Sequence, residues 1–202
     1  MRIQIDPMRP KPRTAQQVAE ILKDGGIVVY PTDTVYALGF IVSNKHGLDR
    51  ISQIKASVKP KSIIFADIKD ISEYAKVSNE AYRLMRLLFP GPYTLILPAT
   101  RHVPRLLQSK RKSIGVRIPD HWFCRELVSQ IGEPIITTSI PLTDDQIHID
   151  PIEIEVHLGN RVEAIVDSGI LPDIPSTVVS LETDSPEIVR YGLGPTDIFE
   201  AA

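Results

Sequence analysis

Apolar residues in the first part of the chain change from helical spacing to strand spacing. In segment 14–24, Val18, Ile21 and Leu22 recur at three- and four-residue intervals, and Gly25-Gly26 follows where a helix needs a left-handed cap. The next run, Ile27-Val-Val-Tyr30, is apolar and rich in β-branched residues, which favours a buried strand. The pattern predicts a helix followed by a strand.

Short apolar runs of strand type recur along the rest of the chain. They lie at 62–66, 94–97, 114–118, 134–139, 164–166, 176–181 and 187–190, and helical patterns lie near 46–55, 80–89 and 121–131. Some of these runs follow one another too closely for a helical crossover, so antiparallel pairs must accompany parallel ones. We predict an α/β fold with one twisted, mixed parallel and antiparallel sheet and flanking helices. It forms a single domain over residues 1–202, with its core at about 12–200.

The composition is that of a globular protein rather than a membrane protein. The chain has 202 residues, of which 43% are hydrophobic, and this is enough to bury one core. No apolar stretch approaches the roughly 20 residues of a membrane span, and the first residues lack the apolar run of a signal peptide. We therefore expect a cytoplasmic location. The single cysteine cannot form an internal disulfide, and the five histidines have no ligand spacing, so we expect no protein-bound metal.

Charge is segregated along the chain. Residues 81–119 contain eight Lys and Arg and no acid, whereas residues 144–202 contain thirteen acids and two cations, Arg161 and Arg190. A basic segment attracts phosphates, although a solvated surface gives the same pattern. If this segment binds RNA, the candidate contacts are Arg101, Arg105, Lys110, Arg111 and Lys112.

The first predicted strand is followed by a cluster of polar side chains. Thr32, Asp33, Thr34 and Tyr36 offer three hydroxyls and a carboxylate directly after Tyr30. Ligands of open α/β sheets bind at strand ends, so these residues are candidates for a site. The same residues also fit a turn that is held only by local hydrogen bonds. The usual phosphate-loop and dinucleotide motifs are absent.

The run Tyr30-Pro-Thr-Asp-Thr-Val-Tyr-Ala-Leu-Gly39 resembles the opening motif of the YrdC/YciO family. Later segments resemble further motifs of the family in the same order: Pro90-Gly-Pro-Tyr-Thr94, Gly115-Val-Arg-Ile-Pro-Asp120, Thr137-Thr-Ser139, Pro175-Ser-Thr-Val-Val179 and Val189-Arg-Tyr-Gly192. The resemblance covers nearly the whole chain. It implies a YrdC-like α/β domain around a basic concave cavity.

The resemblance also implies an activity. Many members of that family make threonylcarbamoyl-adenylate from threonine, bicarbonate and ATP, and release pyrophosphate, for the N6-threonylcarbamoyl modification of adenosine in tRNA. The expected substrates are thus L-threonine and ATP with Mg²⁺, and the chemistry needs no covalent intermediate, so we assign no catalytic residue. Some members have been credited with binding double-stranded RNA. The alternative is therefore a non-catalytic protein that binds double-stranded RNA, tRNA or the ribosome through the same cavity.

Carried over position by position, the resemblance assigns two groups of residues. It implies threonine contacts from Thr34, Arg117, Thr137 and Ser176. It implies nucleotide contacts from Lys55, Lys59, Lys61, Ser139 and Arg190. A guanidinium suits the carboxylate of threonine because it pairs with both oxygens. Structural ion pairs of Arg117 and Arg190 with the C-terminal acids are the alternative interpretation.

Three positions depart from the synthases of that family and resemble its YciO branch. The Lys-x-Arg segment reads Lys55-Ala-Ser57, the Ser-x-Asn segment reads Ser139-Ile-Pro141, and Ala66 stands where threonine-binding members have a histidine. Each lost charge-assisted hydrogen bond costs about 1.5–3 kcal/mol. We therefore expect weaker or altered activity.

Overall fold

The computed structural model describes residues 1–54, 62–140, 149–183 and 185–200. Its strands are β1 (Arg2–Gln4), β2 (Val28–Tyr30), β3 (Ala37–Ile41), β4 (Ser62–Ile64), β5 (Tyr93–Pro98), β6 (Ser113–Arg117), β7 (Ile135–Ser139), β8 (Ala164–Asp167), β9 (Thr177–Ser180) and β10 (Glu187–Arg190). All of these strands belong to one sheet, in the order β1-β8-β2-β3-β7-β4-β6-β5-β9-β10.

The sheet mixes both strand orientations, as predicted. The pairs β1/β8, β2/β8, β4/β6 and β5/β9 are parallel, and the pairs β2/β3, β3/β7, β4/β7, β5/β6 and β9/β10 are antiparallel. The antiparallel pairs β2/β3 and β5/β6 are consecutive in the chain, so short connections suffice between them. The prediction of a single-domain, mixed α/β sheet is confirmed.

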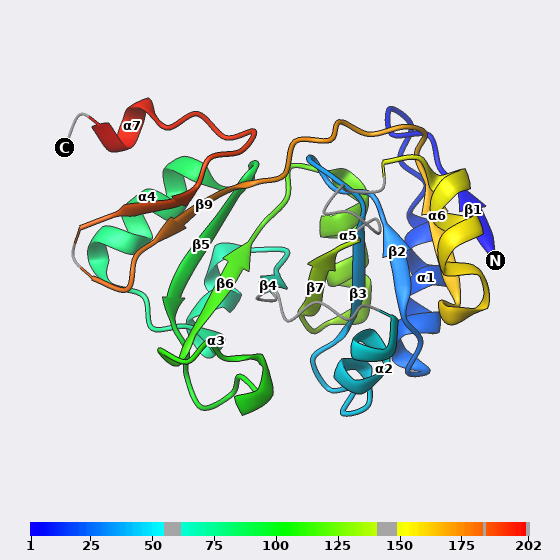
Figure 1. Ribbon diagram of the computed structural model, residues 1–202, viewed down its shortest axis with the longest axis horizontal. Helices are drawn as coiled ribbons and strands as arrows, with labels where there is room; N and C mark the ends of the chain where they lie inside the picture. The colour runs from blue at the N-terminus through cyan, green and yellow to red at the C-terminus, as the bar shows by residue number, and fades with distance from the viewer. Residues whose placement is uncertain (55–61, 141–148, 184, 201–202) are drawn as a thin grey trace.

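Helices flank the sheet (Figure 1). They are α1 (Pro12–Lys23), α2 (Gly47–Ile54), α3 (Ile71–Tyr74), α4 (Asn79–Leu88), α5 (Trp122–Ile131), α6 (Pro151–Leu158) and α7 (Asp197–Glu200), with short 3-10 helices η1 (Ile68–Asp70), η2 (Arg105–Leu107) and η3 (Gly159–Arg161). The first helix begins at Pro12, whose fixed φ suits the first helical position, and it is followed by Gly25 at φ 87°. In the described part of the chain, no helix is long and apolar enough to span a bilayer.

The core lies on both faces of the sheet. Val28 and Tyr30 pack in the cluster that contains residues of α1 and α5, whereas Ile27 and Val29 pack in the cluster on the opposite face. Neighbouring residues of a strand point to opposite faces, so a strand covered on both sides needs an uninterrupted apolar run. This explains why the run 27–30 has no polar position.

Candidate functional site

The turn between β2 and β3 is held by its own threonines. Thr32 Oγ1 donates to the carbonyl of Val35 (2.7 Å) and accepts from the backbone N–H of Thr34 (3.1 Å). The hydroxyls of Thr32 and Thr34 lie 3.0 Å apart, and both side chains are buried. The local hydrogen bonds anticipated for this turn are therefore present, and they fix the direction of the neighbouring side chains.

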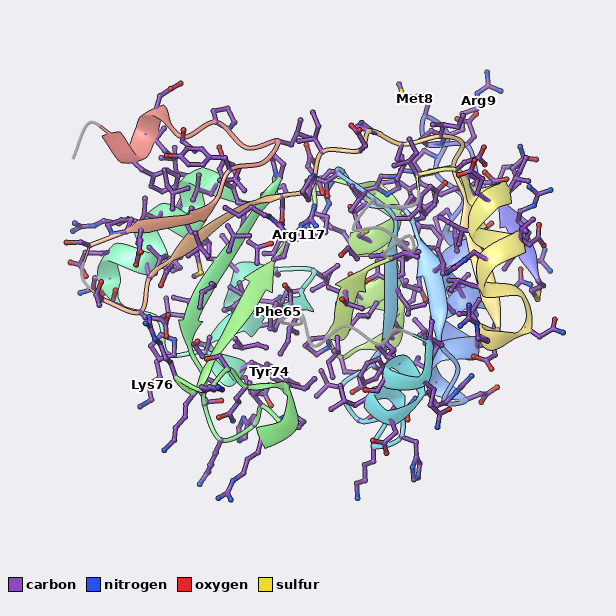
Figure 2. All side chains as sticks on the ribbon, viewed as in Figure 1. Met8, Arg9, Phe65, Tyr74, Lys76 and Arg117 are labelled. Atoms are coloured by element: carbon purple, nitrogen blue, oxygen red, sulfur yellow. The ribbon has the colours of Figure 1, made fainter. Side chains whose placement is uncertain are left out.

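Arg117, the last residue of β6, contacts this turn. Its Nη2 donates to Asp33 Oδ1 (2.5 Å) and to Thr34 Oγ1 (2.7 Å). The side chains of Arg117 and Asp33 are each 9% exposed, so the ion pair is largely shielded from water. The second oxygen of Asp33 accepts from the backbone N–H of Asp120 (2.9 Å). Figure 2 shows Arg117 in the middle of the molecule, between the part that carries β5, β6 and β9 and the part that carries β2, β3 and β7.

These contacts correct one interpretation and leave one donor unused. The ion pair of Arg117 is with Asp33 of the opening motif, and not with an acid of the C-terminal third. Arg117 Nε is buried and has no hydrogen-bond partner among the described residues. A buried N–H without a partner is unfavourable, and a ligand oxygen at this position would satisfy it.

Arg190, the last residue of β10, contacts Ser176. Its Nε and Nη2 donate to the carbonyl of Ser176 (3.1 and 2.8 Å), and Nη2 also lies 3.2 Å from Ser176 Oγ. The hydroxyls of Ser176 and Thr94 are 2.8 Å apart. Burial and the nearby positive charge of Arg117 lower the pKa of Arg190. The fold thus brings two guanidinium groups and the Ser176 hydroxyl into one region, from β6, β10 and the residue before β9.

Thr137 and Ser139 lie on β7, beside β3. In the register, Thr137 faces Gly39 and Ser139 faces Ala37. The hydroxyls of Thr137 and Tyr30 are both buried, and neither forms a hydrogen bond of good geometry with a described residue. The pKa of Tyr30 is raised above its ordinary value because the ring is buried and Cys124 is close by, while Thr137 and Arg117 oppose the rise.

His121 lies at the junction between β6 and α5, close to the Asp33 carboxylate. It precedes α5 and stacks on Trp122, with 6.4 Å between the ring centroids. Burial lowers the pKa of His121, while the nearby charges of Asp33 and Asp120 raise it and Arg125 lowers it. The balance favours the neutral imidazole, so Arg117 is the cation that neutralises Asp33.

Several of the other residues singled out from the sequence lie outside the described part of the chain. Lys55, Lys59 and Lys61 lie outside the described residues, as do Ser57 and Pro141. Ala66 is partly buried and packs on the cluster of α1 and α5.

The proposed RNA contacts also lie elsewhere. The cations concerned are all exposed on the loop between β5 and β6: Arg101, Arg105, Lys110, Arg111 and Lys112. This loop precedes Ser113, whereas Arg117 ends β6, so the two regions are about 13 Å apart along the strand. Figure 1 places the loop at the lower end of β5 and β6. Arg111 lies 3.8 Å from Glu182 in a surface ion pair. The structure therefore does not bring these cations into one site with Arg117.

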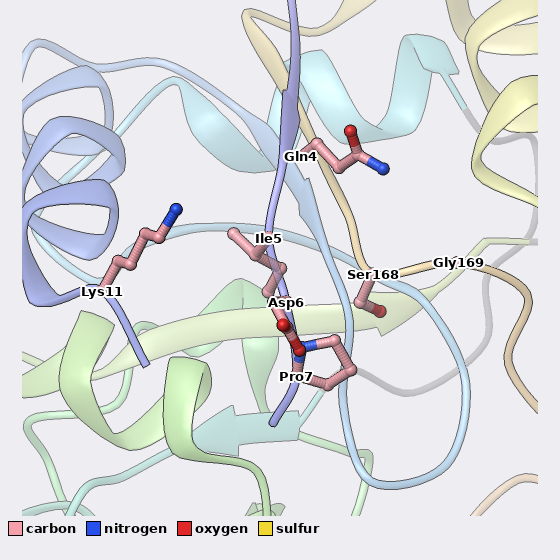
Figure 3. A pocket seen from close by; sticks show the side chains of 7 residues that line it. All are labelled: Gln4, Ile5, Asp6, Pro7, Lys11, Ser168 and Gly169. Carbon is pink, nitrogen blue, oxygen red and sulfur yellow. The ribbon is translucent and has the colours of Figure 1, made fainter. Parts of the chain in front are cut away.

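One surface hollow lined by described residues does not include Arg117 or Arg190. This hollow has a volume of about 500 Å³ and is lined by Gln4, Ile5, Asp6, Pro7, Lys11, Ser168 and Gly169 (Figure 3). It adjoins the opening motif through Tyr36, whose hydroxyl donates to the carbonyl of Gly169 (2.7 Å). The basic concave cavity implied by the resemblance stays an expectation.

Three residues of these contacts have partners that the sequence does not indicate. Asp33 and Tyr36 lie in the opening motif, which was the signal that singled them out, but no pattern showed their partners. Thr94 ends the Pro90–Thr94 motif, and its partner Ser176 is 82 residues away in the chain. Contacts over such separations depend on strand order, which local patterns do not determine.

Comparisons with known proteins agree with this architecture. A family model named Sua5/YciO/YrdC, described as telomere recombination, matches residues 20–192. The chain is 40% identical over 194 residues to the uncharacterized protein YciO of Escherichia coli (strain K12), covering 94% of each chain. It is 31% identical over 156 residues to a threonylcarbamoyl-AMP synthase of Vibrio vulnificus (strain YJ016), covering 75% of this chain and 84% of the synthase.

Solved structures of the same family have the same fold as this chain. The crystal structure of E. coli YciO superposes with a TM-score of 0.93 at 37% identity, covering 98% of both chains. The crystal structure of P. abyssi Sua5 complexed with L-threonine superposes with a TM-score of 0.92 at 26% identity, covering 100% of this chain and 60% of that one. The motif order, the sheet and the sequence identities lead to one conclusion: this chain belongs to the Sua5/YciO/YrdC family.

Proposed function

We propose that this chain is a cytoplasmic threonylcarbamoyl-adenylate synthase, which binds L-threonine at Arg117 and Thr34 and ATP with Mg²⁺ beside Arg190. The observation that carries the proposal is the arrangement of Arg117. Its guanidinium lies at a strand end, largely buried, with one N–H unsatisfied by the described residues and a second guanidinium nearby. Such a site favours a bound anion, because an anion relieves the repulsion between the cations.

The chemistry fits a site without a nucleophilic side chain. The threonine amine adds to carbon dioxide, which bicarbonate supplies, and loses a proton to water to give a carbamate. One carbamate oxygen then attacks the α-phosphate of ATP, and pyrophosphate leaves. The protein must align the two reactants and offset negative charge, which are tasks for guanidinium and hydroxyl groups. The Mg²⁺ in this scheme is held largely by the phosphates of ATP.

The relatives support the same assignment. The Vibrio vulnificus relative is a threonylcarbamoyl-AMP synthase, and P. abyssi Sua5 has been crystallised with L-threonine. The substitutions Ser57, Ala66 and Pro141 remove polar groups that synthases of the family carry. We therefore propose a synthase of reduced activity.

The test is threonine-dependent formation of AMP and pyrophosphate. Purified protein is incubated with ATP and Mg²⁺, with and without threonine and bicarbonate, and an active synthase of the family is run alongside. We expect AMP formation that requires both additions and is lost in Arg117→Ala and in Arg190→Ala. Arg86→Ala, which removes an exposed cation of α4, serves as the matched control. The proposal is wrong if high concentrations of this protein release no AMP while the active relative does.

A second candidate function is RNA binding by the loop between β5 and β6. The favouring observation is that all five of its proposed contact residues are exposed on one loop of an acid-free segment. Binding through phosphates weakens steeply with salt. A double-stranded RNA should bind at low salt, and the variant with Lys110, Arg111 and Lys112 changed to Ser should bind more weakly, while Arg117→Ala binds normally. RNA binding that survives the triple change excludes this surface.

A further inference from the structure

Nη2 of Arg117, the nitrogen that a ligand carboxylate needs, already donates hydrogen bonds within the protein. A guanidinium can pair with both oxygens of a carboxylate through either of two edges, Nε with Nη2 or Nη1 with Nη2. Both edges include Nη2. The two hydrogens of Nη2 are already used by Asp33 Oδ1 and Thr34 Oγ1, at 2.5 and 2.7 Å. A carboxylate that binds Arg117 through two nitrogens must therefore displace one of these contacts.

The remaining donor indicates which edge a ligand would use. Nε lies on the same edge as Nη2, and it is buried without a partner among the described residues. Asp33 accepts a hydrogen bond from Nη2 but none from Nε. Its other oxygen accepts instead from the backbone N–H of Asp120, at 2.9 Å. A ligand carboxylate on the edge of Nε and Nη2 would make two hydrogen bonds where Asp33 makes one. It would also satisfy a donor that is otherwise buried without an acceptor.

We propose that Asp33, rather than Thr34, is the contact that a ligand carboxylate displaces from Arg117, so that this internal carboxylate is a specificity-determining residue. The bond between Asp33 and the Asp120 N–H holds the displaced side chain beside the site. Displacement requires a group that competes for a cation, so a ligand with an amide or an alcohol in place of the carboxylate is rejected. That the natural ligand is threonine rests on the proposed function, whereas the competition applies to any carboxylate.

The probe that isolates this competition is 3-hydroxybutanoate, which is threonine without its amine. Its binding is measured by calorimetry to wild type and to Asp33→Asn. The asparagine keeps the shape of the side chain and an oxygen for the Asp120 N–H, but it removes the competing charge. We expect Asp33→Asn to bind the probe at least about tenfold more tightly than wild type. The gain should disappear in the double variant Asp33→Asn/Arg117→Gln.

Matched controls separate this effect from general changes in charge or folding. Asp70→Asn removes an exposed carboxylate that makes no side-chain cap at α3, so it should bind the probe as wild type does. Thermal unfolding shows whether each variant is folded, and Asp33→Ser replaces Asp33→Asn if the latter is not. Probe binding to the folded Asp33 variants that is equal to wild type, or weaker, would overturn the proposal. Asp33 would then only position Arg117.

The same titrations with L-threonine keep the two proposals distinct. If threonine does not bind to wild type or to Asp33→Asn, but 3-hydroxybutanoate binds more tightly to Asp33→Asn, the proposed function fails and the inference stands. If threonine binds to wild type and neither ligand gains affinity in Asp33→Asn, the inference fails and the proposed function stands.

Discussion

The hydroxyls of Ser176 and Thr94 lie 2.8 Å apart, although one residue precedes β9 and the other lies in β5. The same serine accepts three contacts from Arg190, two through its carbonyl and one through its hydroxyl. Ser176 thus joins β5, β9 and β10 at the end of the sheet. Arg190 therefore has a structural role beside the nucleotide-binding role proposed for it.

This relationship predicts that changes at Ser176 and Thr94 are not additive. Ser176→Ala leaves the Thr94 hydroxyl, which is 6% exposed, without this partner, and we expect a loss of about 1–3 kcal/mol in the free energy of unfolding. Thr94→Val should lower the free energy of unfolding by less than Ser176→Ala does, because the Ser176 hydroxyl keeps its contact with Arg190. Urea denaturation of the double variant should show a loss smaller than the sum, because no hydroxyl is left unpaired. A fully additive loss would contradict the pairing.

Tyr36 holds the start of the connector between β8 and β9. Its hydroxyl donates to the carbonyl of Gly169 (2.7 Å) and accepts from the backbone N–H of Ser168 (3.0 Å). Tyr36→Phe leaves both backbone groups without this partner, so we expect a loss of about 1–3 kcal/mol in unfolding free energy. Tyr82→Phe, on the exposed face of α4, is the control and should change stability little. Equal stabilities of the two variants would show that the hydroxyl of Tyr36 contributes nothing.

The sequence predicted the elements whose spacing is regular and missed those whose pattern is ambiguous. Strand β3 was not expected, because Gly39 and the polar turn before it suggested only a loop. The structure explains the glycine: a Cβ at this position would lie 2.8 Å from Tyr30 Cε1 and 2.8 Å from Ile135 Cγ2. A glycine within a strand thus marks close packing here.

Helix α6 was missed for a different reason. Its apolar residues Ile152, Ile154 and Val156 alternate with polar ones, as in a strand. The start of the helix is fixed by Pro151 and by Asp150, whose carboxylate accepts from the backbone N–H of Ile152 (2.8 Å). The capping residues therefore outweigh the apolar pattern. Val156 stays 83% exposed as a result.

In the candidate site too, local sequence patterns do not indicate which distant residues are in contact. Motif resemblance singled out Thr34 and Arg117, which are in contact in the structure. Nothing in either segment indicated that Asp33 would be the ion-pair partner of Arg117, 84 residues away. Which acid reaches a buried arginine depends on how the strands are ordered, and that order is a property of the whole chain.

The hydrogen bonds of Glu163 should make the folded protein less stable at acid pH. Its carboxylate accepts from Arg50 (2.8 Å) and from the backbone N–H of Ile27 (2.6 Å). Burial opposes the charged form, but these hydrogen bonds outweigh it and lower the pKa of Glu163. In the unfolded chain a glutamate titrates at about 4.3. The stabilisation is therefore present above that pH and is lost as the pH falls through the lower folded pKa.

Glu163→Gln tests this dependence. The side chain of Glu163 is 41% exposed, so we expect a loss of less than about 1 kcal/mol at pH 7. The difference from wild type should shrink towards zero as the pH falls below the lowered pKa of the folded state, because the carboxylate is then protonated in both states. Urea denaturation across this range measures it, with Glu20→Gln, an exposed residue of α1, as the control. A difference that does not change with pH would exclude the charge of Glu163 as its cause.

The burial of Tyr30 should make the folded protein less stable at alkaline pH. Its ring is fully buried, and burial raises the pKa of its hydroxyl above the value of about 10 in an unfolded chain. Below that pH both states keep the proton, and the stability is unaffected. Above it the unfolded chain loses the proton while the folded chain keeps it, so the folded state loses stability by about 1.4 kcal/mol per pH unit from this residue.

Tyr30→Phe should remove this contribution. Near pH 8 we expect its stability to lie within about 1 kcal/mol of wild type, because the hydroxyl makes no hydrogen bond of good geometry with a described residue. Between pH 10 and 11 the variant should lose less stability than wild type by about 1 kcal/mol, because the unfolded tyrosine is only half ionised at pH 10. Tyr191→Phe, at a residue that is 71% exposed, should follow wild type throughout. If Tyr30→Phe and wild type lose stability in parallel above pH 10, the folded protein ionises this hydroxyl as readily as the unfolded chain does.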